Sequence, residues 1–164
     1  MGRYKELVKH KAYILSTFVG IIFLIASLFV NFYAGQYATD SVSSPVTDII
    51  LSNTRVYDVD GIFVYGAVIF WVYISVLCLL EPRRIPFTLK SIALFTVIRS
   101  VFVSLTHIGP FPVTVALDQH NIISIFSFGG DLFFSGHTGA PFLMALVFWE
   151  SKWLRVSMIA SAIL

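Results

Sequence analysis

The sequence predicts an all-α fold, a polytopic bundle of transmembrane helices in which residues 1–164 form a single domain. Hydrophobic residues make up 57% of the chain and charged residues 12%, whereas soluble domains carry about 25% charged residues. Several stretches with few or no charged residues approach the roughly 20 apolar residues that a helix needs to cross a bilayer. The basic residues concentrate in alternate connections between these stretches. Together these observations favour an integral membrane protein over a soluble or disordered one.

Four stretches have the length and composition of membrane spans. The first, 12–33, is longer than the apolar core of a signal peptide, so we expect an uncleaved helix. The others are 61–80, then 88–108, which contains Arg99, and then 132–149, which contains His137.

The last apolar stretch, 153–164, is too short to cross a membrane. Its 12 residues would rise roughly 18 Å as a helix, against about 30 Å for the hydrocarbon core. We therefore expect that it either lies in the membrane interface or begins a fifth span that continues beyond Leu164.

The distribution of charge orients the predicted bundle. Nine of the 11 basic residues lie in the amino-terminal tail, between the second span and the start of the third, and after the fourth span. The other connections, 34–60 and 109–131, carry six aspartates and a single basic residue, Arg55. Because cytoplasmic loops carry an excess of lysine and arginine, we expect a cytoplasmic amino terminus. The two polar connectors would then face the periplasm, the exterior or an organelle lumen.

Composition also limits the kinds of partner and cofactor. The net charge of +2 is too small to indicate a nucleic-acid partner. Cys78 is the single cysteine, so the chain can form no internal disulfide and no metal site built on cysteines. We expect a protein in contact with lipid.

Arg99 is a charged residue in the middle of a predicted span. A charge within the bilayer costs at least ~2.5 kcal/mol on insertion scales and is usually turned toward the bundle interior. Thr96, Arg99 and Thr106 share one stripe of the predicted helix, which would face inward and toward the outer side. Arg99 could bind a substrate phosphate there, or it could anchor a neighbouring helix or a lipid phosphate.

A second polar group opens the fourth span. Gly129 and Gly130 end the outer connector, and Ser135-Gly136-His137-Thr138 begins an apolar helix. A helix amino terminus has unsatisfied backbone N–H groups that attract anions. Ser135 could cap the helix, Gly136 would let a phosphate approach the backbone, and His137 could transfer a proton. The plainer alternative is a capping Ser-Gly followed by a histidine bonded to a neighbour.

These residues carry a family resemblance. Residues 130–138, Gly-Asp-Leu-Phe-Phe-Ser-Gly-His-Thr, resemble the G-D-x-x-F-S-G-H-T signature of the sphingomyelin synthase family. Their Ser-Gly-His core is similar to the second motif of the wider type 2 phosphatidic-acid phosphatase superfamily. Arg99, Thr106 and Pro110-Phe111-Pro112 resemble the synthase signature R…T…P-x-P, with the prolines about one residue late.

The resemblance implies a six-helix membrane enzyme that acts on a lipid phosphate at the non-cytoplasmic face, through a phosphohistidine and without a metal. His137 would be a catalytic histidine that protonates the departing group. Arg99, Ser135 and Gly136 would hold the phosphate, and Asp131 and Thr138 would orient a histidine or the headgroup.

The sequence also departs from the family pattern. The family's H-x-x-x-D pair is missing from these 164 residues, because neither His107 nor His120 has an aspartate four residues on. We expect those two histidines to be solvated or structural, and the natural chain to continue beyond Leu164. The superfamily's K-x6-R-P motif is missing too.

The function expected from the sequence is that of a phospholipid phosphatase or headgroup phosphotransferase, with a membrane phospholipid or sphingolipid as substrate. The acceptor, water or a lipid alcohol, stays open, because one site chemistry serves many lipids. A lipid- or phosphate-binding or transport protein without turnover is the main alternative. A purely structural bundle, with Arg99 in a contact between helices, is the third.

Overall fold

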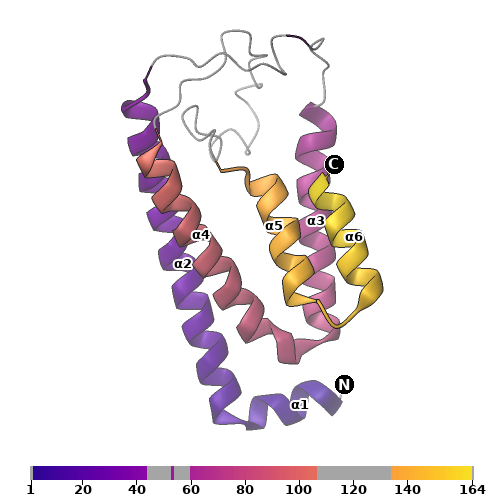
Figure 1. Ribbon diagram of the computed structural model, residues 1–164. Helices are drawn as coiled ribbons and strands as arrows, with labels where there is room; N and C mark the ends of the chain where they lie inside the picture. The colour runs from indigo at the N-terminus through magenta and orange to yellow at the C-terminus, as the bar shows by residue number, and fades with distance from the viewer. Residues whose placement is uncertain (1, 44–52, 54–59, 107–133, 164) are drawn as a thin grey trace.

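The computed structural model describes residues 2–43, 53, 60–106 and 134–163, and every regular element among them is a helix (Figure 1). This confirms the all-α class. Within the described ranges the chain forms α1 (Gly2–Lys9), α2 (Lys11–Asp40), α3 (Asp60–Leu80), the 3-10 helix η1 (Pro82–Arg84), α4 (Ile85–Leu105), α5 (Gly136–Val147) and α6 (Lys152–Ile163).

The most extensive contact between helices of the described chain is that of α2 with α4, which lie side by side along most of their length. Small side chains of α2, among them Gly20, Ser27 and Gly35, are buried, as are Ala93 and Ser100 of α4. A Cβ placed on Gly20 would lie 3.1 Å from the Cβ of Leu89. Small residues let helix backbones approach closely, as is common between membrane helices.

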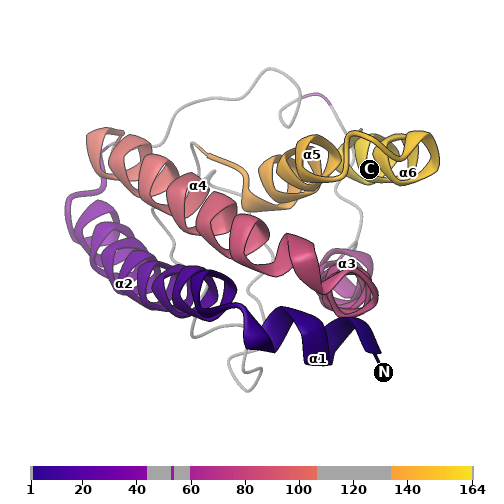
Figure 2. The same ribbon diagram turned by 90° about the horizontal axis from the view of Figure 1, so that it is seen from below.

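The other half of the fold is a hairpin of α5 and α6 that packs beside α3. Ile74 of α3 is buried in one cluster with Met144, Phe148 and Met158 from the hairpin. Viewed along the bundle, α4 lies between α2 on one side and the α5–α6 pair on the other (Figure 2). The helix that carries Arg99 is therefore central to the arrangement.

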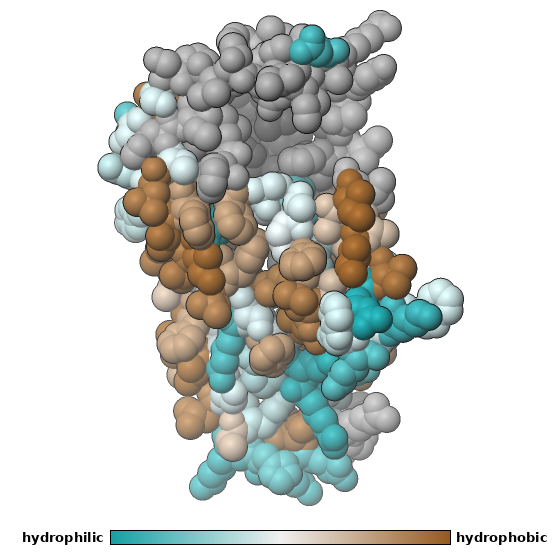
Figure 3. Space-filling view, viewed as in Figure 1, coloured by the Kyte–Doolittle hydropathy of each residue, from teal (hydrophilic) through white to brown (hydrophobic). Residues whose placement is uncertain are grey.

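Two helices of the described chain, Lys11–Asp40 and Pro82–Leu105, are long and apolar enough to cross a membrane. The part of α3 from Tyr65 to Leu80 is a shorter apolar helix. Brown, hydrophobic side chains cover much of the flank of the molecule, and hydrophilic ones gather at the lower end (Figure 3). The fold thus supports association with a membrane, while the four-span bundle stays a prediction.

The first and third predicted spans have different ends in the structure. α2 continues to Asp40, so residues 34–40 are helical and do not belong to the expected solvated connector. α4 begins at Ile85, earlier than expected at 88, because Pro86 in its first turn needs no helical hydrogen-bond partner for its nitrogen. It ends at Leu105, with Thr106 in an extended conformation as its carboxy-terminal cap.

The fourth predicted span, 132–149, forms a shorter helix within the described residues. α5 covers 12 residues, Gly136–Val147, which rise only about 18 Å and do not cross a hydrocarbon core of about 30 Å. It begins late because Ser135 is its extended amino-terminal cap, and it ends early in a turn where the Phe148 N–H donates to Met144 O. α6 runs back alongside α5 and does not lie flat across the end of the bundle (Figure 1).

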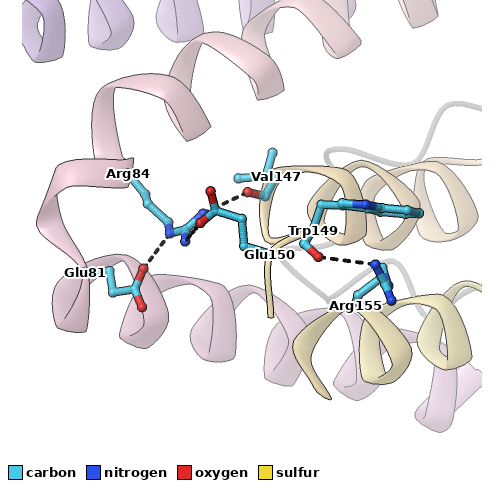
Figure 4. Close-up of polar contacts among 6 residues, drawn as sticks. All are labelled: Glu81, Arg84, Val147, Trp149, Glu150 and Arg155. Carbon is cyan, nitrogen blue, oxygen red and sulfur yellow. Dashed lines mark hydrogen bonds and ion pairs between the residues drawn. The ribbon is translucent and has the colours of Figure 1, made fainter. Parts of the chain in front are cut away.

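A polar network joins two turns at the end of the bundle where α1 lies (Figure 4). From its guanidinium, Arg84 donates hydrogen bonds to Oε2 of Glu81 and, at 2.7 Å, to Oε2 of Glu150. It also donates to Val147 O at 3.2 Å, and its guanidinium lies 5.4 Å from the ring centre of Phe148. Through these contacts Arg84 links the turn before α4 to the turn that follows α5.

The close approach of α2 and α4 predicts different results for substitutions at two glycines. Gly20→Leu would push a side chain against Leu89 and Pro86 and should destabilise the fold by about 1–3 kcal/mol, the usual cost of overpacking. Gly66→Leu in α3 is the matched control, because a Cβ there meets no atom within 4 Å. Unfolding of both variants in a detergent titration measures the difference, and equal stabilities would contradict the packing.

Candidate anion site at the start of α5

Arg99 connects three elements of the fold. It extends from α4, and its Nη1 donates to Asn31 Oδ1 of α2 at 2.7 Å. Its Nε donates at 3.1 Å to the carbonyl oxygen of Phe134, two residues before α5 begins. The side chain is partly buried. The expected inward orientation of Arg99 is thus observed, and so is the contact with neighbouring helices that was the alternative interpretation.

Asn31 is the partner that the sequence analysis missed. Its Oδ1 accepts from Arg99 and, at a longer 3.5 Å, from the Oγ of Ser100. The signal was present as a single amide within the apolar segment 12–33. An amide in such a segment is costly unless it is hydrogen-bonded, so it predicts a polar partner on a neighbouring helix without identifying which one.

Ser135 is the amino-terminal cap of α5, as predicted. Its backbone is extended, and its Oγ accepts the Thr138 N–H at 3.3 Å. The Gly139 N–H donates to Ser135 O at 3.0 Å, which is the first hydrogen bond of the helix. Capping of this kind satisfies one of the backbone donors that every helix leaves at its start.

Aromatic packing fixes the start of α5 against α4. The ring of Phe134 meets Phe95 edge-on at 5.6 Å and stacks on Phe102 at 6.0 Å. A Cβ on Gly139 would lie 2.6 Å from Cζ of Phe95, so a larger residue there would displace that ring. The first turn of α5 is therefore held close to the helix that carries Arg99.

The result is a group of predicted site residues around one helix terminus. An ideal Cβ on Gly136 would lie 3.7 Å from Arg99 Nε, in ordinary contact. Partial desolvation and the charge of Arg99 lower the pKa of His137. Ser135, His137 and Thr138 are exposed. A guanidinium, a helix amino terminus and a histidine can together bind an anion and exchange a proton with it.

Other predicted residues do not join this group in the described chain. Thr96 and Thr106 donate their hydroxyls to Ile92 O and Phe102 O of their own helix, so the expected polar stripe reduces to Arg99. Asp131, His107 and His120 lie outside the described residues. No group of three His, Cys, Asp or Glu in the described ranges is placed to hold a metal ion.

The geometry predicts an energetic coupling between Asn31 and Arg99. In a double-mutant cycle of Asn31→Leu and Arg99→Leu, the sum of the two single losses of stability should exceed the loss in the double variant. Hydrogen bonds between membrane helices suggest a coupling of about 0.6–1.7 kcal/mol. Asn31→Asp, which keeps the acceptor, should retain stability. Additive effects in the unfolding measurement would show that the two side chains do not interact.

The comparisons with known proteins identified no related protein. No protein-family model matches the chain, and no curated protein or solved structure matches it significantly. The role of the site therefore depends on the sequence pattern and on the contacts of Arg99 and α5.

Proposed function

We propose that the protein is an integral membrane phospholipid phosphatase or headgroup phosphotransferase, similar to the sphingomyelin synthases, that acts on a lipid phosphate at the start of α5. Arg99, Ser135 and Gly136 would bind the phosphate, His137 would protonate the departing group, and Thr138 and Asp131 would orient the headgroup. The active site would face the periplasm, the exterior or a lumen.

One observation carries this proposal: two positive groups converge at the start of α5. The amino terminus of a helix carries roughly half a positive charge, and Arg99 donates to the carbonyl of Phe134 directly before it. Arg84 makes the contrast, because it donates to Val147 O at the opposite, negative end of the same helix. A cation is favourable at a carboxy terminus and unfavourable at an amino terminus, by about 0.3–1 kcal/mol at exposed sites.

A phosphate between Arg99 and the first turn of α5 would reverse this unfavourable arrangement. It would be attracted by the guanidinium and by the helix terminus at once, and charge-assisted hydrogen bonds to phosphate are roughly twice as strong as neutral ones. Both groups are held in place by packing and hydrogen bonds within the fold, so binding would require little rearrangement. These features support an anionic ligand at this position.

The chemistry would need a proton donor and a nucleophile. His137 belongs to the first turn of α5 and is exposed. Partial desolvation and the charge of Arg99 lower the pKa of its imidazole from the ordinary value, and a bound phosphate anion would raise that pKa again. As a general acid His137 would protonate the leaving alcohol while the phosphorus–oxygen bond breaks. The attacking histidine would come from the H-x-x-x-D pair that the resemblance implies and that these 164 residues do not contain.

Substitution of His137 tests the proposal. In the protein expressed from its complete coding sequence, His137→Ala should lower headgroup release by about 100-fold or more, the usual contribution of general acid catalysis. Release of phosphate, phosphocholine and phosphoethanolamine from micellar lipids, with and without diacylglycerol or ceramide as acceptor, measures the reaction and its class.

His10→Ala is the matched control, because His10 is exposed and lies between α1 and α2, away from α5. It should keep full activity. If His137→Ala retained as much activity as His10→Ala, the catalytic role of His137 would be wrong.

The second candidate function is binding or transport of a phosphate-bearing lipid without turnover. The same positive groups at the start of α5 would serve it, because binding an anion requires no attacking group. It predicts that lipid phosphate binds in an Arg99-dependent manner while no headgroup is released by any form of the protein. Headgroup release that depends on His137 would exclude it.

A further inference from the structure

The end of the bundle opposite the start of α5 brings together basic residues from several elements. Exposed Lys9 ends α1, exposed Lys11 begins α2, exposed Arg83 lies in η1, and exposed Lys152 begins α6. The sequence of α1 adds Arg3 and Lys5. We name the surface formed by Lys9, Lys11, Arg83 and Lys152 the basic end. Figure 3 shows hydrophilic side chains gathered in this lower part of the molecule.

The acidic residues of this region are three glutamates, and ion pairs within the fold use two of them. Glu81 and Glu150 are both paired with Arg84 (Figure 4), and Glu6 is the one other glutamate of the chain. The neighbouring lysines are exposed. The basic end therefore presents a positive surface even though the net charge of the whole chain is only +2.

Two further features of this end are typical of surfaces at the level of lipid headgroups. α1 turns away from α2 and runs across the end of the bundle (Figure 1), where the hydroxyl of Tyr4 donates to Leu79 O, close to the end of α3. Trp149 and Trp153 are exposed at the α5–α6 turn. Amphipathic aromatic rings concentrate at membrane–water interfaces, and a short basic helix perpendicular to a span can lie in the interface plane.

We propose that the basic end binds the headgroups of anionic lipids in the leaflet that it faces, with α1 lying on that leaflet. The proposal requires α2 to cross the membrane and is independent of any phosphoryl chemistry at α5. Clusters of four or more basic residues next to a span attract anionic lipid by about fivefold in affinity per cation near the surface.

Lipid selectivity in nanodiscs tests this proposal. The protein is placed in phosphatidylcholine nanodiscs that contain trace spin-labelled phosphatidylglycerol or spin-labelled phosphatidylcholine, and the protein-associated fraction of each label is measured by electron paramagnetic resonance. Both leaflets carry the label, so the orientation of the protein does not matter. The wild type should select phosphatidylglycerol several-fold at 50 mM salt, and the preference should fall at 500 mM because salt screens exposed charges.

Charge variants identify the surface responsible. Lys9→Gln, Lys11→Gln and Arg83→Gln combined should remove most of the preference. Glu6→Gln, a matched change of an exposed residue on α1, should increase it. Helical content by circular dichroism shows that each variant is folded, and single substitutions replace the combined variant if it is not.

Two results would overturn the proposal. They are equal association of the two labels with the wild type, and a preference that the combined variant retains.

Discussion

The hydrogen bonds of Arg99 are the constraint on which the arrangement of the helices depends. A guanidinium between apolar helices is tolerated only when its donors are satisfied, and two of its bonds go to Asn31 of α2 and to the carbonyl of Phe134. Satisfying Arg99 therefore requires α2 and the start of α5 to lie against the same turn of α4. Small residues along α2 and Gly139 in α5 allow that approach.

A structural role for Arg99 and a role in binding are compatible, because both need the same rigidity. The bonds to Asn31 and Phe134 fix the plane of the guanidinium, and recognition of a phosphate through two parallel hydrogen bonds requires a fixed plane. The exposed first turn of α5 lies next to it. Contacts that only stabilised the bundle would not require a cation at the positive end of a helix, as the position of Arg84 at the other end of α5 illustrates.

The sequence predicted the helices better than their ends. Apolar stretches located α2, α3 and α4, because burial or lipid contact selects for them over many residues. The start of α5 depended on one capping hydroxyl at Ser135, and its end depended on a turn held by Arg84 from far along the chain. The pair of Asn31 and Arg99 lay beyond prediction for a similar reason, since the two are separated by 68 residues and nothing local to either identifies the other.

The two arginines also account for the position of α5 along the bundle. Arg84 directly precedes α4 and bonds to Val147 O, the last residue of α5, while Arg99 bonds to Phe134 O before its first turn. Fifteen residues separate the arginines, roughly 22 Å of helix, and thirteen separate the two carbonyls, roughly 20 Å. Because these two lengths match, α5 can lie antiparallel to α4 with both of its ends hydrogen-bonded to an arginine. A helix of this length places Ser135 and Gly136 beside Arg99, so the shortness of α5, which prevents it from crossing a bilayer, is also what positions the candidate site.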